Sequence, residues 1–279
     1  MIGRLAREQA FRRTGAGAER IATSRAFEWF ARAGFVARGT IYLILGILAA
    51  GLALGVGGRP ANQQGAFEAI ARHSFGGVLL ALVGAGLAGY SVWRLTRAAL
   101  GHGPEGADSG SERLVALASG LAYAVLCALA VEILIGSGGG SSATPQKPAS
   151  GVLGWPGGTL LVGAAGAVVV GVGLYQGYRG LTGSFLDDSK TEQMRSAVRT
   201  FFEWVGAFGY LARMVAFGLG GVFLVKAAVD FDPSKAVGLD GALTKLLHAP
   251  YGPIMVGIVA AGLLAFGLFS LGDARYHRI

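Results

Sequence analysis

Residues 34–56 read GFVARGTIYLILGILAAGLALGV, and the only charged side chain in this stretch is Arg38, near its beginning. A run of about 20 apolar residues is the length that an α-helix needs to cross the hydrocarbon core of a bilayer. Five further stretches of similar length follow, near residues 74–95, 113–135, 156–177, 207–229 and 251–272. Each must be helical in lipid, because backbone groups there find no water to bond. The sequence therefore predicts an all-α membrane protein with six transmembrane helices.

The composition of the 279-residue chain agrees with this prediction. Hydrophobic residues make up 53% of the chain and charged residues 14%, whereas soluble domains carry about 25% charged residues. The chain has 48 glycines, a residue that lets membrane helices approach closely. Its single cysteine, Cys127, excludes an internal disulfide and a cysteine-based metal site.

The six stretches form three pairs that align with one another without gaps inside the helices. The coinciding positions include Gly76, Gly158 and Gly252 at the start of the second helices, Tyr42, Tyr123 and Phe217 in the first helices, and Gly46, Cys127 and Gly221. Cys127 therefore reads as a small packing residue. An even number of spans per repeat gives all repeats one orientation, so we expect pseudo-threefold symmetry about the membrane normal.

Each second helix carries a stripe of small residues at every fourth position, and such residues share one helix face. The stripes are Ala81, Ala85 and Gly89 in the first pair, Gly163, Ala167 and Gly171 in the second, and Gly257, Ala261 and Ala265 in the third. Stripes of this kind allow close helix packing. We therefore expect the three second helices to pack around the pseudo-threefold axis through these stripes.

The chain divides into a basic N-terminal segment with an interfacial helix (1–33) and three two-helix repeats, at 34–101, 112–181 and 190–275. The Gly/Ser-rich outer loop 136–151 of the second repeat reads as a flexible linker. In the third repeat, the amphipathic stretch 194–205 predicts a helix lying on the inner membrane surface. The last outer loop predicts a short helix near 239–247.

Basic charge alternates between the two sides of the membrane. Of the 24 Lys and Arg residues, 18 lie in the segments of one side and 6 in those of the other. The positive-inside rule then predicts that both termini are cytoplasmic. The net charge of +8 comes mainly from the basic residues that set the orientation of the protein in the membrane. We expect these residues to contact anionic lipid headgroups. Nucleic acid is not an expected partner, because no basic-aromatic binding module accompanies the arginines.

Two pairs of ionisable residues within the spans are the candidate polar site. Arg38 and Arg213 share one repeat position about a turn inside their helices. Three interpretations are open for these arginines: binding of an anionic headgroup, lining of a vestibule, and snorkelling of the side chain to the interface. We favour snorkelling. Glu132 and Lys226 share another position, near the outer ends. We favour an ion pair between repeats for them, with exposed interfacial charges and a solute or proton site as alternatives.

Catalytic and metal sites leave no recognisable pattern in the sequence. The four histidines are scattered among loops and the tail, without metal-ligand spacing, and no cofactor is expected. Arg97 and Arg179, which align with Asp273, end their helices, where basic residues suit the helix dipole. We expect a non-enzymatic membrane protein with a structural, lipid-binding or protein-binding role. The alternative is a small-solute or ion channel or transporter with an axial path.

The openings of the first and third repeats share a Gly-aromatic-x-Ala-Arg pattern, at residues 34–38 and 209–213. The middle repeat matches only through Ala118, Gly120 and Tyr123. In these residues the chain resembles the uncharacterised bacterial membrane family domain of unknown function 1206, whose members carry three tandem two-helix modules. The resemblance covers residues 27–275 and implies six spans in a bacterial inner membrane. It implies no activity or ligand, so no functional residue is carried over.

Overall fold

The computed structural model describes residues 25–56, 61–72, 74–100, 110–136 and 151–277. Within these residues, six helices are long and apolar enough to cross a membrane. They are α2 (Arg25–Ala53), α4 (Gly76–Leu100), α5 (Gly110–Leu134), α7 (Gly158–Thr182), α8 (Ser196–Val229) and α10 (Gly252–Tyr276). Large apolar side chains on these helices remain exposed, among them Leu82, Val125, Leu160, Val222 and Ile258. The predicted all-α membrane fold with six spans is confirmed.

Short helices occupy the connections. Two of them are α3 (Gln63–Ala71), between α2 and α4, and α9 (Leu239–Leu247), between α8 and α10. The 3₁₀ turns are η1 (Ser184–Leu186), η2 (Thr191–Gln193) and η3 (Pro233–Lys235). The short helix predicted at 239–247 is confirmed as α9, whereas α3 was not expected. The backbone N–H of Ala61 donates to Asp240 Oδ1 at 2.8 Å, which joins the α2–α4 and α8–α10 connections. Most of the predicted linker 136–151 and of the segment 1–33 lies outside the described residues.

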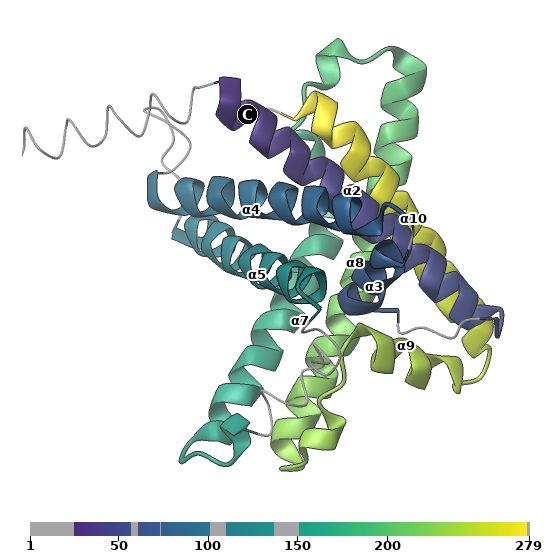
Figure 1. Ribbon diagram of the computed structural model, residues 1–279. Helices are drawn as coiled ribbons and strands as arrows, with labels where there is room; N and C mark the ends of the chain where they lie inside the picture. The colour runs from purple at the N-terminus through teal and green to yellow at the C-terminus, as the bar shows by residue number, and fades with distance from the viewer. Residues whose placement is uncertain (1–24, 57–60, 73, 101–109, 137–150, 278–279) are drawn as a thin grey trace, which may run out of the picture.

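Three closely packed helix pairs form the bundle, and each pair joins two different repeats (Figure 1). Helix α4 packs along α5, α7 along α8, and α10 along α2. The second helix of every repeat thus packs against the first helix of the next repeat, and the third repeat returns to the first. This cyclic order is the pairing expected of three repeats related by a pseudo-threefold axis.

The same residue contact recurs in all three pairs. It joins Leu271 to Gly39 in α10 and α2, Leu95 to Gly120 in α4 and α5, and Met214 to Gly177 in α8 and α7. These positions are equivalent in the repeat alignment, although the long side chain and the glycine exchange helices in the third pair. A Cβ atom on any of these glycines would collide with its partner side chain. Close helix approach in lipid depends on such small residues.

A second set of contacts also joins positions that are equivalent in the repeat alignment. A Cβ on Gly221 would lie 2.7 Å from the backbone nitrogen of Val170 and 2.8 Å from the carbonyl oxygen of Gly166. In the second repeat, the Sγ atom of Cys127 lies 3.4 Å from the carbonyl oxygen of Gly84. The prediction that Cys127 replaces a packing glycine is therefore confirmed.

Helix contacts within repeats are uneven. Helices α2 and α4 pack together in the first repeat, and α8 and α10 in the third. Helices α5 and α7 of the middle repeat make no comparably extensive contact among the described residues. The helices therefore follow one another in the order α5, α4, α2, α10, α8 and α7, and the two ends of this series are separated.

The expectation that the small-residue stripes hold the second helices together is wrong. Helices α4, α7 and α10 share no extensive contact with one another within the described ranges. Of the stripe residues, Ala81, Ala85, Ala167, Gly171 and Ala261 are exposed, Gly89, Gly163 and Gly257 are partly exposed, and Ala265 is buried. The packing face of α7 instead carries Gly166, Val170, Gly173 and Gly177, about a quarter turn away. In a glycine-rich helix, small residues recur at helical spacing on more than one face.

The predicted interfacial helix before the third repeat is not a separate element. From Ser196 onward, this stretch forms the first turns of α8, which continues to Val229. A helix of 34 residues is about 50 Å long and exceeds the hydrocarbon core of about 30 Å. Phe202 in its first turns is buried, with its ring 4.5 Å from that of Phe269. The stretch therefore packs on the bundle instead of lying flat on the membrane.

Gly221→Leu is expected to destabilise the protein by about 1–3 kcal/mol or more, because the new side chain meets backbone atoms of α7. Gly171→Leu is the matched control, since nothing lies within 4 Å of a Cβ at that position, and we expect little change. Thermal unfolding of purified protein in detergent measures both. Equal losses in the two variants would contradict the assignment of the packing face.

Candidate functional site

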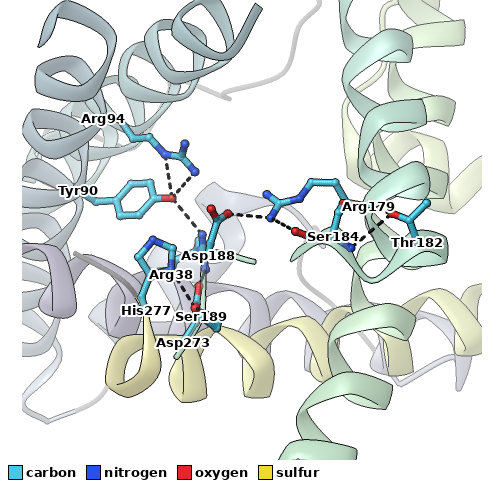
Figure 2. Close-up of polar contacts among 10 residues, drawn as sticks. All are labelled: Arg38, Tyr90, Arg94, Arg179, Thr182, Ser184, Asp188, Ser189, Asp273 and His277. Atoms are coloured by element: carbon cyan, nitrogen blue, oxygen red, sulfur yellow. Dashed lines mark hydrogen bonds and ion pairs between the residues drawn. The ribbon is translucent and has the colours of Figure 1, made fainter. Parts of the chain in front are cut away.

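Arg38 lies in α2 with 6% of its surface exposed, and its guanidinium donates three hydrogen bonds. Its Nε donates to Ser270 Oγ at 2.8 Å. Its Nη1 donates to the Tyr90 hydroxyl at 3.0 Å and its Nη2 to Asp273 Oδ2 at 3.2 Å, two partners that Figure 2 draws. These acceptors belong to α10 and α4. Arg38 therefore does not snorkel to the membrane interface, and the favoured interpretation of this residue is wrong.

The carboxylate of Asp273 also ties the end of the chain to the connection between α7 and α8. Its Oδ1 accepts from Ser189 Oγ at 3.2 Å and lies 3.0 Å from His277 Nδ1. The backbone N–H of Lys190 donates to the Tyr276 carbonyl at 2.7 Å, and Ser189 and His277 form an isolated antiparallel bridge. One buried ion pair thus fastens α2, α4, α10 and the α7–α8 connection.

Aromatic rings enclose this network. The Arg38 guanidinium carbon lies 4.7 Å from the Phe35 ring centroid and 5.4 Å from that of Phe266. A second guanidinium, of Arg94, donates from Nε and Nη2 to the same Tyr90 hydroxyl at 3.1 and 2.9 Å. Contacts with aromatic faces stabilise cations that have lost water. The enclosure keeps solvent away, so each partner in the network depends on the others.

A second ion pair joins Arg179, in the last turn of α7, to Asp188 in the following connection, at 2.8 Å. Arg179 also donates to the Ser184 carbonyl at 3.2 Å, which closes the turn after α7. Burial by itself raises the pKa of the Asp188 carboxyl, but the charge and hydrogen bond of Arg179 outweigh it. The pKa of Asp188 is therefore lower than its ordinary value of 3.8.

Arg213, the repeat equivalent of Arg38, has very different surroundings. Its guanidinium carbon lies 4.3 Å from the Phe266 ring centroid, 5.2 Å from that of Phe217 and 5.3 Å from that of Tyr42. Its Nε is buried without a hydrogen-bond partner, and the side chain as a whole stays partly exposed. The structure gives Arg213 aromatic neighbours and, among the described residues, no acceptor.

Glu132 and Lys226 are both exposed, and no ion pair joins them in the described structure. They belong to α5 and α8, which make no extensive contact with each other there. The favoured interpretation, an ion pair between repeats, is therefore wrong. The exposed positions agree with the alternative of interfacial charges.

Sequence reasoning missed the acceptors of Arg38. Asp273 was interpreted only as a helix-terminal residue, and Tyr90, Ser270 and Ser189 were not singled out. The available signal was a charge reversal, because Asp273 stands where the other repeats have Arg97 and Arg179. A single carboxylate among aligned arginines marks the position at which an arginine of a neighbouring helix can be paired.

Pockets and metal clusters add no further site within the described residues. Two shallow hollows of about 380 Å³ each lie on the surface, one beside Arg113 and Leu117 and one beside Ala50 and Pro253. Neither hollow is lined by Arg38, Arg213, Glu132 or Lys226. No group of three His, Cys, Asp or Glu side chains meets in the described part of the chain.

Replacing Asp273 by Leu is expected to destabilise the protein by about 3–5 kcal/mol, because it leaves the Arg38 charge buried without its counter-ion. The double variant Arg38→Leu/Asp273→Leu is expected to lose less than either single variant, since no charge is then left unpaired. Denaturant or thermal unfolding in detergent measures the cycle. Additive losses would show that the two residues do not act as a pair.

Asp188→Asn is expected to remove a stabilisation of up to about 1 kcal/mol at pH 7, because the pair is partly exposed. Since the pKa of Asp188 is lower in the folded protein, this stabilisation is complete above the ordinary value of 3.8 and disappears as the pH falls through the folded pKa. Unfolding curves of wild type and variant should converge in acid. A difference that grows on acidification would contradict this assignment.

The comparisons with known proteins agree with the repeat structure. A family model described as Domain of Unknown Function (DUF1206) matches residues 33–112, 114–183 and 208–277. The "Uncharacterized protein YxxB" of Bacillus subtilis (strain 168) is 30% identical over 253 residues, which cover 90% of this chain and 91% of that protein. No solved structure matches the chain. With one match on each two-helix repeat, the chain belongs to the Domain of Unknown Function 1206 family.

Proposed function

We propose that this multi-pass protein is a non-enzymatic component of the bacterial plasma membrane, with a structural role or a role in binding lipid or another protein. Its N- and C-termini lie in the cytoplasm, and its arginine-rich end contacts anionic lipid headgroups. The observation that carries this proposal is the separation of charge along the bundle, together with the use of buried charge inside it.

Charge separation supports the orientation. The last turns of α4, α7 and α10 carry Arg97, Arg179 and Arg275. The first turns of α8 begin at the same end, where Figure 1 shows the connection from α7. Basic residues concentrate on the cytoplasmic side of membrane proteins. An end that is rich in arginine also attracts anionic lipids of the inner leaflet, at about 1 kcal/mol per basic residue near the surface.

Buried polar groups support a structural role. Arg38, Asp273 and Ser270 bond to one another inside the bundle, and none of them lines either surface hollow. Ionisable residues within membrane spans usually face a substrate path or pair with one another. Here the pairing joins the first membrane span to the last among the described residues, and we infer that its effect is to close the bundle.

The orientation is tested by cysteine labelling of cells in a Cys127→Ala background. Ser196, at the start of α8, and Ser74, before α4, are both exposed and lie at opposite helix ends. Ser74→Cys should react with a membrane-impermeant maleimide in intact cells. Ser196→Cys should react only after permeabilisation. The reverse pattern would refute cytoplasmic termini, and equal labelling of both sites would refute the six-span topology.

A further inference from the structure

Repeat symmetry places Arg213 in a copy of the Arg38 site that lacks the hydroxyl and the carboxylate. In the alignment of the repeats, the acceptors Tyr90, Ser270 and Asp273 of Arg38 correspond to Phe266, Gln176 and Arg179 around Arg213. The helices correspond as well, because α8 packs on α10 and α7 as α2 packs on α4 and α10. Arg213 therefore occupies the equivalent position without the hydroxyl and the carboxylate that bind Arg38.

The first lost acceptor is a hydroxyl. Arg38 donates to the Tyr90 oxygen at 3.0 Å, whereas Arg213 lies 4.3 Å from the centroid of the Phe266 ring. A phenyl ring attracts a cation through its face but has no oxygen to accept a hydrogen bond.

The second lost acceptor is the counter-ion. The position of Asp273 is taken on α7 by Arg179, a second cation, whose own partner is Asp188 at 2.8 Å. Gln176, at the position of Ser270, makes no hydrogen bond with Arg213 in the described structure. Both helices of this pair thus carry arginine at the equivalent positions, and the carboxylate of Asp188 is bound to Arg179.

A guanidinium has five N–H donors in a planar fork that matches two oxygens of a carboxylate or phosphate. Leaving such donors unsatisfied in a region of low dielectric is costly. The side chain of Arg213 is partly exposed, so a ligand can reach it, and the rings of Tyr42, Phe217 and Phe266 form an apolar wall beside it.

We propose that Arg213 is the binding residue of an oxyanion site, in which a phosphate group supplies the acceptors that the third repeat lacks. Arg213 lies about five turns from the start of α8 at Ser196, and an anionic phospholipid attracted to the arginine-rich end is one source of the phosphate group. Free phosphate is the other source of the same chemistry. Assigning the lipid to the inner leaflet rests on the proposed orientation, which the cysteine labelling tests separately.

The test measures the melting temperature of the detergent-purified full chain with phosphatidylglycerol, phosphatidylcholine or inorganic phosphate. Wild type should gain about 5 °C at a hundredfold excess of phosphatidylglycerol over its Kd and nothing from phosphatidylcholine. Arg213→Gln should weaken binding at least about tenfold. Arg213→Lys should bind with intermediate affinity, because it keeps the charge but not the fork. A shift produced by inorganic phosphate alone, and lost in Arg213→Gln, would identify free phosphate as the source.

Arg72→Gln is the matched control, because Arg72 is exposed at the end of the short helix α3, away from the arginine-rich end, and its response to lipid should equal that of wild type. Without ligand, Arg213→Gln should melt at or above the wild-type temperature, whereas Arg38→Gln should melt well below it. The proposal is overturned if Arg213→Gln and wild type respond equally to phosphatidylglycerol and phosphate, or if neither responds. A ligand-free melting temperature for Arg213→Gln as low as that of Arg38→Gln would show an internal structural role instead.

Discussion

The structure depends on one repeated contact, in which a long side chain of one helix enters the space left by a glycine on the helix of the next repeat. Leu271 and Gly39, Leu95 and Gly120, and Met214 and Gly177 are three instances of it. Lipid tails are as apolar as the helices themselves, so close van der Waals contact must hold membrane helices together. A Cβ methyl group at any of these glycines would collide with the partner side chain. Each helix pair therefore depends on the absence of a side chain at its glycine.

Three similar pairs do not make three similar sites. The pair of α2 and α10 joins the first and last spans of the chain, and only there does a carboxylate face the repeated arginine. Asp273 allows Arg38 to be buried, and the same carboxylate holds Ser189 and His277. The pair of α7 and α8 has arginine at both corresponding positions, and Arg179 is neutralised by a residue of the connection. Symmetry in the packing therefore coexists with asymmetry in the charge.

This asymmetry separates two residues that the sequence makes equivalent. Arg38 is enclosed and hydrogen-bonded, so its contribution is to stability, whereas Arg213 is accessible and contacts aromatic rings in place of acceptors. In a repeat protein, one copy of a site can thus hold helices together while another copy remains available for a ligand. The proposed oxyanion site at Arg213 follows from this difference.

The sequence by itself determined the six helices, their grouping into repeats and the small character of positions such as Cys127. Span length, hydropathy and repeat alignment are local properties that need no knowledge of neighbours. Only the tertiary structure decided which face of each helix packs, because stripes of small residues occur on several faces of α7 and the bundle uses the one with Gly166 and Gly173. It also decided that Asp273 pairs with Arg38, across 235 residues of chain. Whether a charge is paired depends on which helices meet, and that is a property of the packing.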